Sequence, residues 1–242
     1  MQLVFQDLYA ALPGISGAQA VRDALQTRRV VDPAGDLPKC PAPVMLRRRL
    51  SPLGRLVLTA VDALQLRDDE PFVVASSWGD APRSLSLIEG MIETGDVSPA
   101  GFTSSVHNAN SGAVGLWLKN HAASPAVSAG NFTTEAGLVE CRLQLATHPS
   151  VVFIRAETPL PAPWNASPHL RHAPAWPYVW AMRLTLQGPG TRLELVPDAA
   201  VGENAGEDDR MDDRMDDLRL MLGLRSTLRR VDNERCWRWT LL

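Results

Sequence analysis

Apolar residues recur with a helical spacing in some stretches of the chain and in short unbroken runs in others. The clearest helical pattern follows Ser51-Pro52, because serine is a favoured helix cap and proline suits the first turn. The apolar positions after it form one stripe: Leu53, Leu56, Val57, Ala60, Val61 and Leu64. Similar spacing predicts helices over residues 18–29, 82–93, 109–120, 134–146 and 218–228. In the helix over 109–120, we expect Ala113, Leu116 and Trp117 to face inward.

Short apolar runs between these helices predict buried strands at residues 3–5, 72–75, 126–128 and 151–154. Residues 178–186 and 193–196 are predicted to pair as a hairpin through Gly188-Pro189-Gly190, and residues 235–241 alternate as a closing strand does. Prolines make the stretches 33–43 and 159–177 irregular. Strands that alternate with helices and then give way to antiparallel strands predict an α/β fold, with helices layered on a mixed sheet.

Composition changes this picture little. The chain has 242 residues, 45% of them apolar, and no apolar run approaches the length of about 18 residues that a membrane span needs. We expect no membrane insertion and, because no basic region precedes an apolar stretch at the N-terminus, no secretory signal. Cys40, Cys141 and Cys236 are too widely spaced for a zinc site. Reduced thiols and a cytoplasmic location are therefore expected, with no metal or cofactor.

The net charge of −3 hides two opposite clusters. Residues 203–217 hold eight acidic residues and two arginines, whereas Arg47, Arg48, Arg49 and Arg55 make the region before the helix at Ser51 basic. The basic cluster is either a contact for an acidic partner or a set of solvated side chains. No basic stripe alternates with aromatic residues, so nucleic acid is not an expected partner. We divide the chain into a domain at 1–200, an acidic segment at 201–217 and a closing helix and strand at 218–242.

Three segments carry more specific motifs. They are Arg-Arg-Arg-Leu-Ser-Pro-Leu-Gly-Arg at 47–55, Val-Val-Ala-Ser-Ser-Trp-Gly-Asp at 73–80 and Ser-Pro-Ala-Gly-Phe-Thr-Ser-Ser-Val-His-Asn-Ala at 98–109, with Gly112 shortly after. From residue 1 to about 197 the chain thus resembles the β-ketoacyl synthase-like N-terminal domain family found beside bacterial aryl-polyene and related pigment synthases. The resemblance implies a thiolase-like fold, one half of the usual duplicated α/β unit. It also implies a similarity to chain-length factors, the inactive partners of polyketide ketosynthases.

The resemblance further implies where a catalytic cysteine would lie, at a tight turn between a short strand and a helix. Counting from Asn108 places that position at Asn131, whose carboxamide cannot take an acyl chain as a thiolate does. The family's oxyanion-binding histidines belong to a C-terminal half that this chain is not expected to contain. We therefore expect a non-catalytic subunit that pairs with a complete β-ketoacyl synthase as a heterodimer and completes its acyl tunnel.

The same resemblance suggests which residues such a subunit would use. The motif residues His107 and Asn108 would hold the turn into the next helix. Ser105, Gly112 and Trp117 are further motif or possible interface residues. An acidic acyl carrier protein would contact Arg47, Arg48, Arg49 and Arg55. Two other readings stay open. One is an acyl hydrolase or transferase that uses Ser105 with His107, or Cys141, and the other is a freestanding module that binds an acyl carrier protein.

Overall fold

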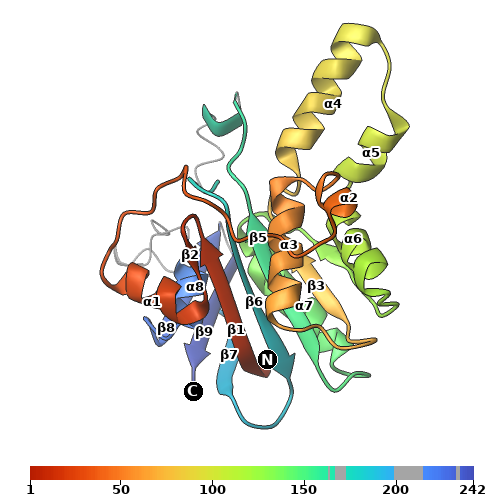
Figure 1. The fold of residues 1–242 in the computed structure, drawn as a ribbon. Helices are drawn as coiled ribbons and strands as arrows, with labels where there is room; N and C mark the ends of the chain where they lie inside the picture. The colour runs from red at the N-terminus through yellow and green to blue at the C-terminus, as the bar shows by residue number, and fades with distance from the viewer. Residues whose placement is uncertain (163, 167–172, 199–214, 233–234) are drawn as a thin grey trace.

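The computed structural model describes residues 1–162, 164–166, 173–198, 215–232 and 235–242, and Figure 1 shows its ribbon. Within these residues nine strands form one mixed sheet in the order β4-β3-β5-β6-β1-β7-β9-β8, with β2 paired to the end of β1. The strands are β1 (Gln2–Leu12), β2 (Ile15–Ser16), β3 (Phe72–Ala75), β4 (Ala126–Val127), β5 (Val151–Glu157), β6 (Tyr178–Thr185), β7 (Thr191–Asp198), β8 (Thr227–Asp232) and β9 (Arg235–Leu241). The helices are α1 (Ala18–Gln26), α2 (Val44–Arg47), α3 (Pro52–Ala63), α4 (Ala81–Thr94), α5 (Pro99–Ser105), α6 (Ala109–Leu118), α7 (Thr133–Gln144) and α8 (Asp216–Met221), with 3-10 turns η1 (Gly130–Phe132) and η2 (Trp164–Ala166).

Different helices cover the two faces of the sheet, so the chain forms three layers. Because successive side chains of a strand point to opposite faces, Val152 and Ile154 of β5 pack with α3 and α6, whereas Val151 and Phe153 pack with α7. Helices α1 and α8 contribute to the same core as α7. The layered α/β fold predicted from the sequence is confirmed.

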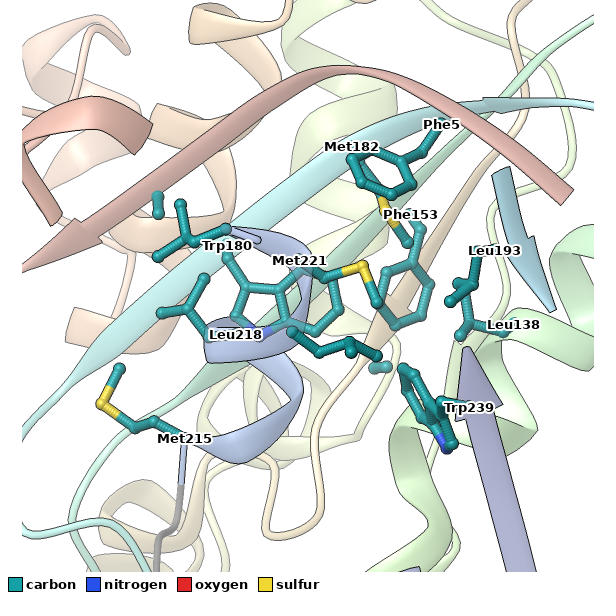
Figure 2. Close-up of a cluster of buried hydrophobic side chains, with 14 of the residues drawn as sticks. Phe5, Leu138, Phe153, Trp180, Met182, Leu193, Met215, Leu218, Met221 and Trp239 are labelled. Carbon is teal, nitrogen blue, oxygen red and sulfur yellow. The ribbon is translucent and has the colours of Figure 1, made fainter. Parts of the chain in front are cut away.

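The core beneath α7 and α8 is rich in large aromatic and sulfur-containing side chains, and Figure 2 shows part of it. Trp180 of β6 packs against Phe153 of β5 with ring centroids 5.2 Å apart. Leu218 and Met221 of α8 pack in the same core (Figure 2). Residues far apart in the sequence are thereby joined in one layer, so residues 215–221 are part of the main core.

Helix α3 begins where the sequence predicts. The Ser51 hydroxyl accepts a hydrogen bond from the backbone N–H of Gly54 at 3.2 Å, and Pro52 occupies the first turn. The same arrangement starts α5, where the Ser98 hydroxyl accepts from the Gly101 N–H at 3.2 Å. The sequence analysis did not predict α5, although its Ser-Pro-x-Gly start repeats that of α3.

The predicted hairpin of residues 178–186 and 193–196 is wrong, because β1 lies between its two strands. Val4 pairs with Thr185 of β6 on one side and with Arg192 of β7 on the other. The turn between β6 and β7 spans this inserted strand, and a Cβ atom at Gly190 would lie 2.5 Å from the Phe5 carbonyl oxygen. Strands β6 and β7 follow each other in the sequence but are thus separated in the sheet by β1.

The helix predicted over 218–228 is also only partly correct. Helix α8 runs from Asp216 to Met221, and Gly223 follows with a φ of 68°, in the left-handed region that ends helices. The chain then enters β8, which pairs with β9. Gly223 was the signal in the sequence for this earlier end.

Helices α4 and α5 form an arm that projects from the layered body (Figure 1). Ala81 is the buried residue of α4, and the arm exposes five large apolar side chains: Ile88, Met91, Ile92, Val97 and Phe102. The expectation that Leu116 faces inward is wrong, because this α6 side chain is 82% exposed. In α6, Val114 is the buried apolar residue, while Trp117 is half-buried against the α3 side of the core. The arm therefore carries a group of exposed apolar side chains, and α6 adds Leu116.

Most of the acidic segment predicted at 201–217 lies outside the described residues, and the domain division at residue 200 stays a prediction. Among the described helices, none combines the length and the apolar character that a membrane-crossing segment requires.

Candidate functional site

The predicted nucleophile-equivalent position, Asn131, lies in a tight turn between a short strand and a helix. Strand β4 ends at Val127, η1 contains Asn131, and α7 begins at Thr133. Gly130 has a φ of 56°, a conformation that glycine adopts without strain. The strand–turn–helix geometry implied by the resemblance is thus present here, and the turn carries a carboxamide.

Hydroxyl groups tie this turn to the end of β3. The Thr133 hydroxyl donates to the Gly130 carbonyl at 2.7 Å and accepts from the Ala129 N–H at 3.0 Å. The Ser77 hydroxyl lies 3.2 Å from that same carbonyl oxygen and 3.1 Å from the Thr133 hydroxyl, and Ser128 donates to the Ser77 carbonyl at 3.1 Å. The backbone of the turn is therefore fixed by side chains from both ends.

A buried ionic network lies beneath the turn, and its first half comes from β5. The Arg155 guanidinium is paired with Glu157 and donates to the Ser77 hydroxyl at 2.9 Å and to the Thr134 hydroxyl at 3.2 Å. Glu157 also accepts hydrogen bonds from the Ser76 hydroxyl and the Ser77 N–H. Both charged residues of β5 thus hold the segment that follows β3.

The second half of the network comes from α8, β8 and β9. Asp217 accepts from the Thr134 hydroxyl at 2.8 Å, and Arg230 lies 3.1 Å from Glu135 and 3.7 Å from Asp217. The Trp239 ring N–H donates to Glu135 at 3.1 Å. Arg230 Nη1 also donates to the Asn131 carbonyl at 3.4 Å. The first turn of α7 is thereby connected to the C-terminal strands.

Burial and opposite charges compete in setting the pKa values of this network. Burial raises the pKa of Glu135, although the positive charge of Arg230 acts to lower that pKa. For Arg230, burial acts to lower the pKa, but the carboxylates of Glu135 and Asp217 outweigh it and raise that pKa. Each charged group described above has an opposite charge or a hydrogen-bond donor beside it. The arrangement is suited to holding the backbone around Asn131 in place.

Sequence reasoning missed this network, although one signal was available. Arg155 and Glu157 continue the alternation of Val151 and Phe153, so period two places them on the α7 face of the sheet. Charged residues on a buried face need partners there. The prediction of a strand that ends at residue 154 left them out.

His107 connects two loops at the edge of the sheet. Its Nε2 lies 3.3 Å from the Val127 carbonyl oxygen. On its other side the ring packs closely on Gly79, where an added Cβ atom would lie 2.7 Å from the His107 Nδ1. Asn108 precedes α6, and its side chain makes no hydrogen bond that caps this helix. His107 is thus held by the loop after β3 and by β4.

The structure does not bring Ser105 and His107 together as the hydrolase reading requires. Ser105 is the last residue of α5 instead of lying on an extended segment, and its hydroxyl donates to the Phe102 carbonyl at 2.8 Å. Cys141 is fully buried in the core between α7 and the sheet. Burial raises the pKa of the Cys141 thiol well above its ordinary value, which disfavours the reactive thiolate.

The remaining candidates lie on other surfaces. Gly112 is exposed on α6, with open space where a Cβ atom would be. Arg48, Arg49 and Arg55 are exposed, whereas Arg47 is half-buried and donates to the Cys40 carbonyl at 3.4 Å. The basic cluster is therefore divided between outward-facing and partly enclosed side chains.

A comparison with protein-family models matches residues 22–240 to the family described as β-ketoacyl synthase, N-terminal domain. The chain belongs to this family. The match extends well beyond residue 197, where the resemblance was predicted to end, and it includes β8 and most of β9. A search of curated proteins found no match.

Solved structures agree with this assignment at the level of the fold. The chain is similar to one in the complex of a ketosynthase, ApeO, with its chain length factor, ApeC, from Xenorhabdus doucetiae, with a TM-score of 0.79, 24% identity and 99% coverage of both chains. The ishigamide ketosynthase/chain length factor gives a TM-score of 0.67 at 14% identity, covering 84% of this chain and 69% of that one. The type II polyketide synthase complex AntDE:AntF gives 0.68 at 11%, with 99% coverage of both. The thiolase-like fold predicted from the motifs is confirmed.

Proposed function

We propose that this β-ketoacyl synthase-like chain is a non-catalytic subunit, of the chain-length-factor kind, that pairs with a complete β-ketoacyl synthase. The observation that carries the proposal is Asn131 in the turn between β4 and α7. Condensation needs a nucleophile that forms a thioester, and a carboxamide forms none. Cys141, on the helix that follows, is enclosed in the core and is no substitute.

The exposed apolar surface supports a dimer. Strand β4 lies at an edge of the described sheet, and edge strands offer unpaired backbone groups to another chain. In addition, α6 exposes Leu116, and the α4–α5 arm exposes Ile92 and Phe102. Large exposed apolar patches typically mark interaction sites. The similar solved structures include complexes of a ketosynthase with a chain length factor, which favours a ketosynthase as the partner.

In this proposal the subunit helps to enclose the acyl tunnel of its partner and to limit how far the chain grows. In the AntDE:AntF complex an acyl-carrier protein is bound to its ketosynthase. In this proposal an acidic carrier of that kind carries the growing chain, and the basic cluster of Arg47, Arg48, Arg49 and Arg55 contacts it. The product class, an aryl polyene or a related pigment, is assigned on family resemblance. The three cysteines are free and buried, which fits the reducing cytoplasm as the site of action.

Co-expression with a ketosynthase encoded in the same gene neighbourhood tests the proposal. We expect the two proteins to elute as one complex in size-exclusion chromatography at micromolar concentration. Leu116→Asp should weaken this complex at least tenfold, because it places a charge in the proposed contact. Leu143→Asp on α7 is the matched control: this side chain is 63% exposed, yet it lies away from α6 and the arm. Separate peaks for the two unmodified proteins, or equal effects of the two substitutions, would contradict the proposed dimer.

Product analysis tests the non-catalytic role. The complex should elongate a malonyl-carrier substrate, whereas the isolated chain should not. Asn131→Ala should leave the rate of the complex within about twofold, since the Asn131 side chain takes no part in bond formation. A loss of elongation in a folded Asn131→Ala complex would show that this side chain acts in the reaction.

A further inference from the structure

A cavity of about 410 Å³ lies between the proline-rich segment before α2 and the start of α3. Three cationic side chains line it, those of Lys39, Arg47 and Arg55, against the single carboxylate of Asp36. The rest of the wall is largely apolar and is formed by Gly35, Leu37, Pro38, Cys40, Pro52 and Leu56. The volume is in the usual range for a small-molecule site.

The cations of this cavity are available for a ligand. In the described part of the chain, Lys39, Arg47 and Arg55 form no ion pair with any carboxylate, including that of Asp36. Like charges gathered around one cavity repel each other, and a bound anion would relieve that repulsion. Pro52, in the first turn of the twelve-residue helix α3, is also part of the wall, so the positive end of this helix adds to the potential.

Arg48 and Arg49 are a useful contrast, because they adjoin Arg47 in sequence but do not line the cavity. Both are exposed, and the Arg49 carbonyl accepts a hydrogen bond from Arg83 at 3.0 Å. The basic cluster therefore has two parts with different surroundings. Arg48 and Arg49 face outward, as a protein contact requires, whereas Arg47 and Arg55 face a space that suits a small anion.

We propose that the cavity of Lys39, Arg47 and Arg55 binds the phosphate group of a phosphate ester. Arginine pairs with phosphate through two parallel N–H bonds. A phosphate monoester carries about two negative charges at pH 7, whereas the diester that links an arm to a carrier carries one, so the monoester should engage the three cations more strongly. The apolar wall accommodates uncharged carbon atoms next to the phosphate. Such a group has two sources, a free phosphorylated thiol or the phosphate through which a carrier protein holds its prosthetic arm. The second source rests on the proposed function, whereas the anion site itself does not.

Calorimetric titration of the isolated chain tests the site without requiring a ketosynthase complex. The probes are pantetheine 4′-phosphate, pantetheine and inorganic pyrophosphate. The first two differ only in the phosphate, and pyrophosphate supplies a phosphate anion without the organic part. We expect pantetheine 4′-phosphate to bind at least tenfold more tightly than pantetheine, with an affinity that falls as the salt concentration is raised. Equal affinities for these two compounds, or no binding of any probe, would overturn the proposal.

The matched variants are R47Q/R55Q within the cavity and R48Q/R49Q beside it. Each removes two positive charges, so a general loss of potential would affect both equally. The cavity variant should lose at least tenfold in affinity and the control less than about twofold. If R47Q/R55Q fails to fold by circular dichroism, Lys39→Gln within the cavity is compared with Arg48→Gln beside it, since each removes one positive charge at an exposed position. Equal losses in the two double variants would overturn the assignment to the cavity.

A carrier protein with and without its prosthetic arm separates the two sources. Tighter binding of the armed form, lost in R47Q/R55Q, supports the carrier as the source. Binding of both carrier forms with equal affinity, together with retained binding of pantetheine 4′-phosphate, supports a free phosphate ester. The second result would preserve the anion site even if the proposed partnership in chain elongation proved wrong.

Discussion

Replacing Arg230 by methionine tests whether the buried network holds the region around Asn131. Arg230 is the cation that faces Glu135 and Asp217, whose exposed fractions are 1% and 3%. Methionine keeps much of the side-chain volume but leaves both carboxylates without this charge. Breaking a buried ion pair by removing one partner costs about 3–5 kcal/mol. Glu135 keeps its bond from Trp239 and Asp217 keeps that from Thr134, so we expect about 3 kcal/mol, the lower end of that range.

Urea unfolding followed by circular dichroism measures this change, and a thermal scan should show a fall of about 6–12 °C in Tm. The control is Arg238→Met, the same substitution at the exposed position that pairs with Arg229 across β8 and β9. It should cost no more than about 0.5 kcal/mol. The double variant of Arg230→Met with Glu135→Met should recover at least about 1 kcal/mol, because no buried charge then faces methionine at that pair. Equal losses for Arg230→Met and Arg238→Met would refute the reasoning.

Three further predictions concern the buried surroundings of Gly137, Cys141 and Glu70. Gly137→Ala in α7 places a Cβ atom 2.5 Å from the ring of Phe153 and should lower the free energy of unfolding in urea by about 1–3 kcal/mol. Its control, Gly90→Ala in α4, meets open space and should raise that free energy by up to about 1 kcal/mol. Similar values for both would contradict the described packing. Cys141 should react with a thiol reagent only after unfolding, as mass mapping would show, and labelling of the native protein within minutes would count against its burial. Burial raises the pKa of Glu70, but hydrogen bonds from its neighbours outweigh this and leave that pKa below 4.5. The contribution of Glu70 to folding stability is therefore present above about pH 4.5 and is lost as the pH falls through the lower folded-state pKa. Glu70→Gln should therefore reduce the loss of urea stability between pH 6 and pH 3, and an unchanged loss would exclude this role.

Local signals predicted the local elements well. Ser51 and Pro52 specify the start of α3 because the cap and the first turn depend on neighbouring residues alone. The start of α5 at Ser98 has the same local signature, so this helix was equally predictable from its sequence. Continuous apolar runs likewise located β3 and the first part of β5.

Features that depend on distant residues were not predictable in this way. The hairpin prediction assumed that neighbouring strands pair, and no local signal shows that Val4 enters between them. Leu116 was assigned to the inner face from its spacing, yet its side chain is 82% exposed, and helical spacing alone does not show which face of α6 meets the core. The turn at Asn131 was found by counting, whereas Arg230, which contacts its carbonyl, lies in β8, a strand that was not predicted and whose first two residues fell within the helix predicted over 218–228.

The position of β1 determines when the sheet can be completed during synthesis. In the described sheet, β7, β9 and β8 connect to β6 only through β1, and the Thr185 hydroxyl reaches the Val4 carbonyl across 181 positions in the sequence. Apart from its short pairing with β2, strand β1 must therefore wait for residues 178–198 to be synthesised before it can pair with β6 and β7. Such non-local pairing slows folding and leaves strand edges transiently open to aggregation. Yield in the cell is thus expected to depend on chaperones and on slow translation.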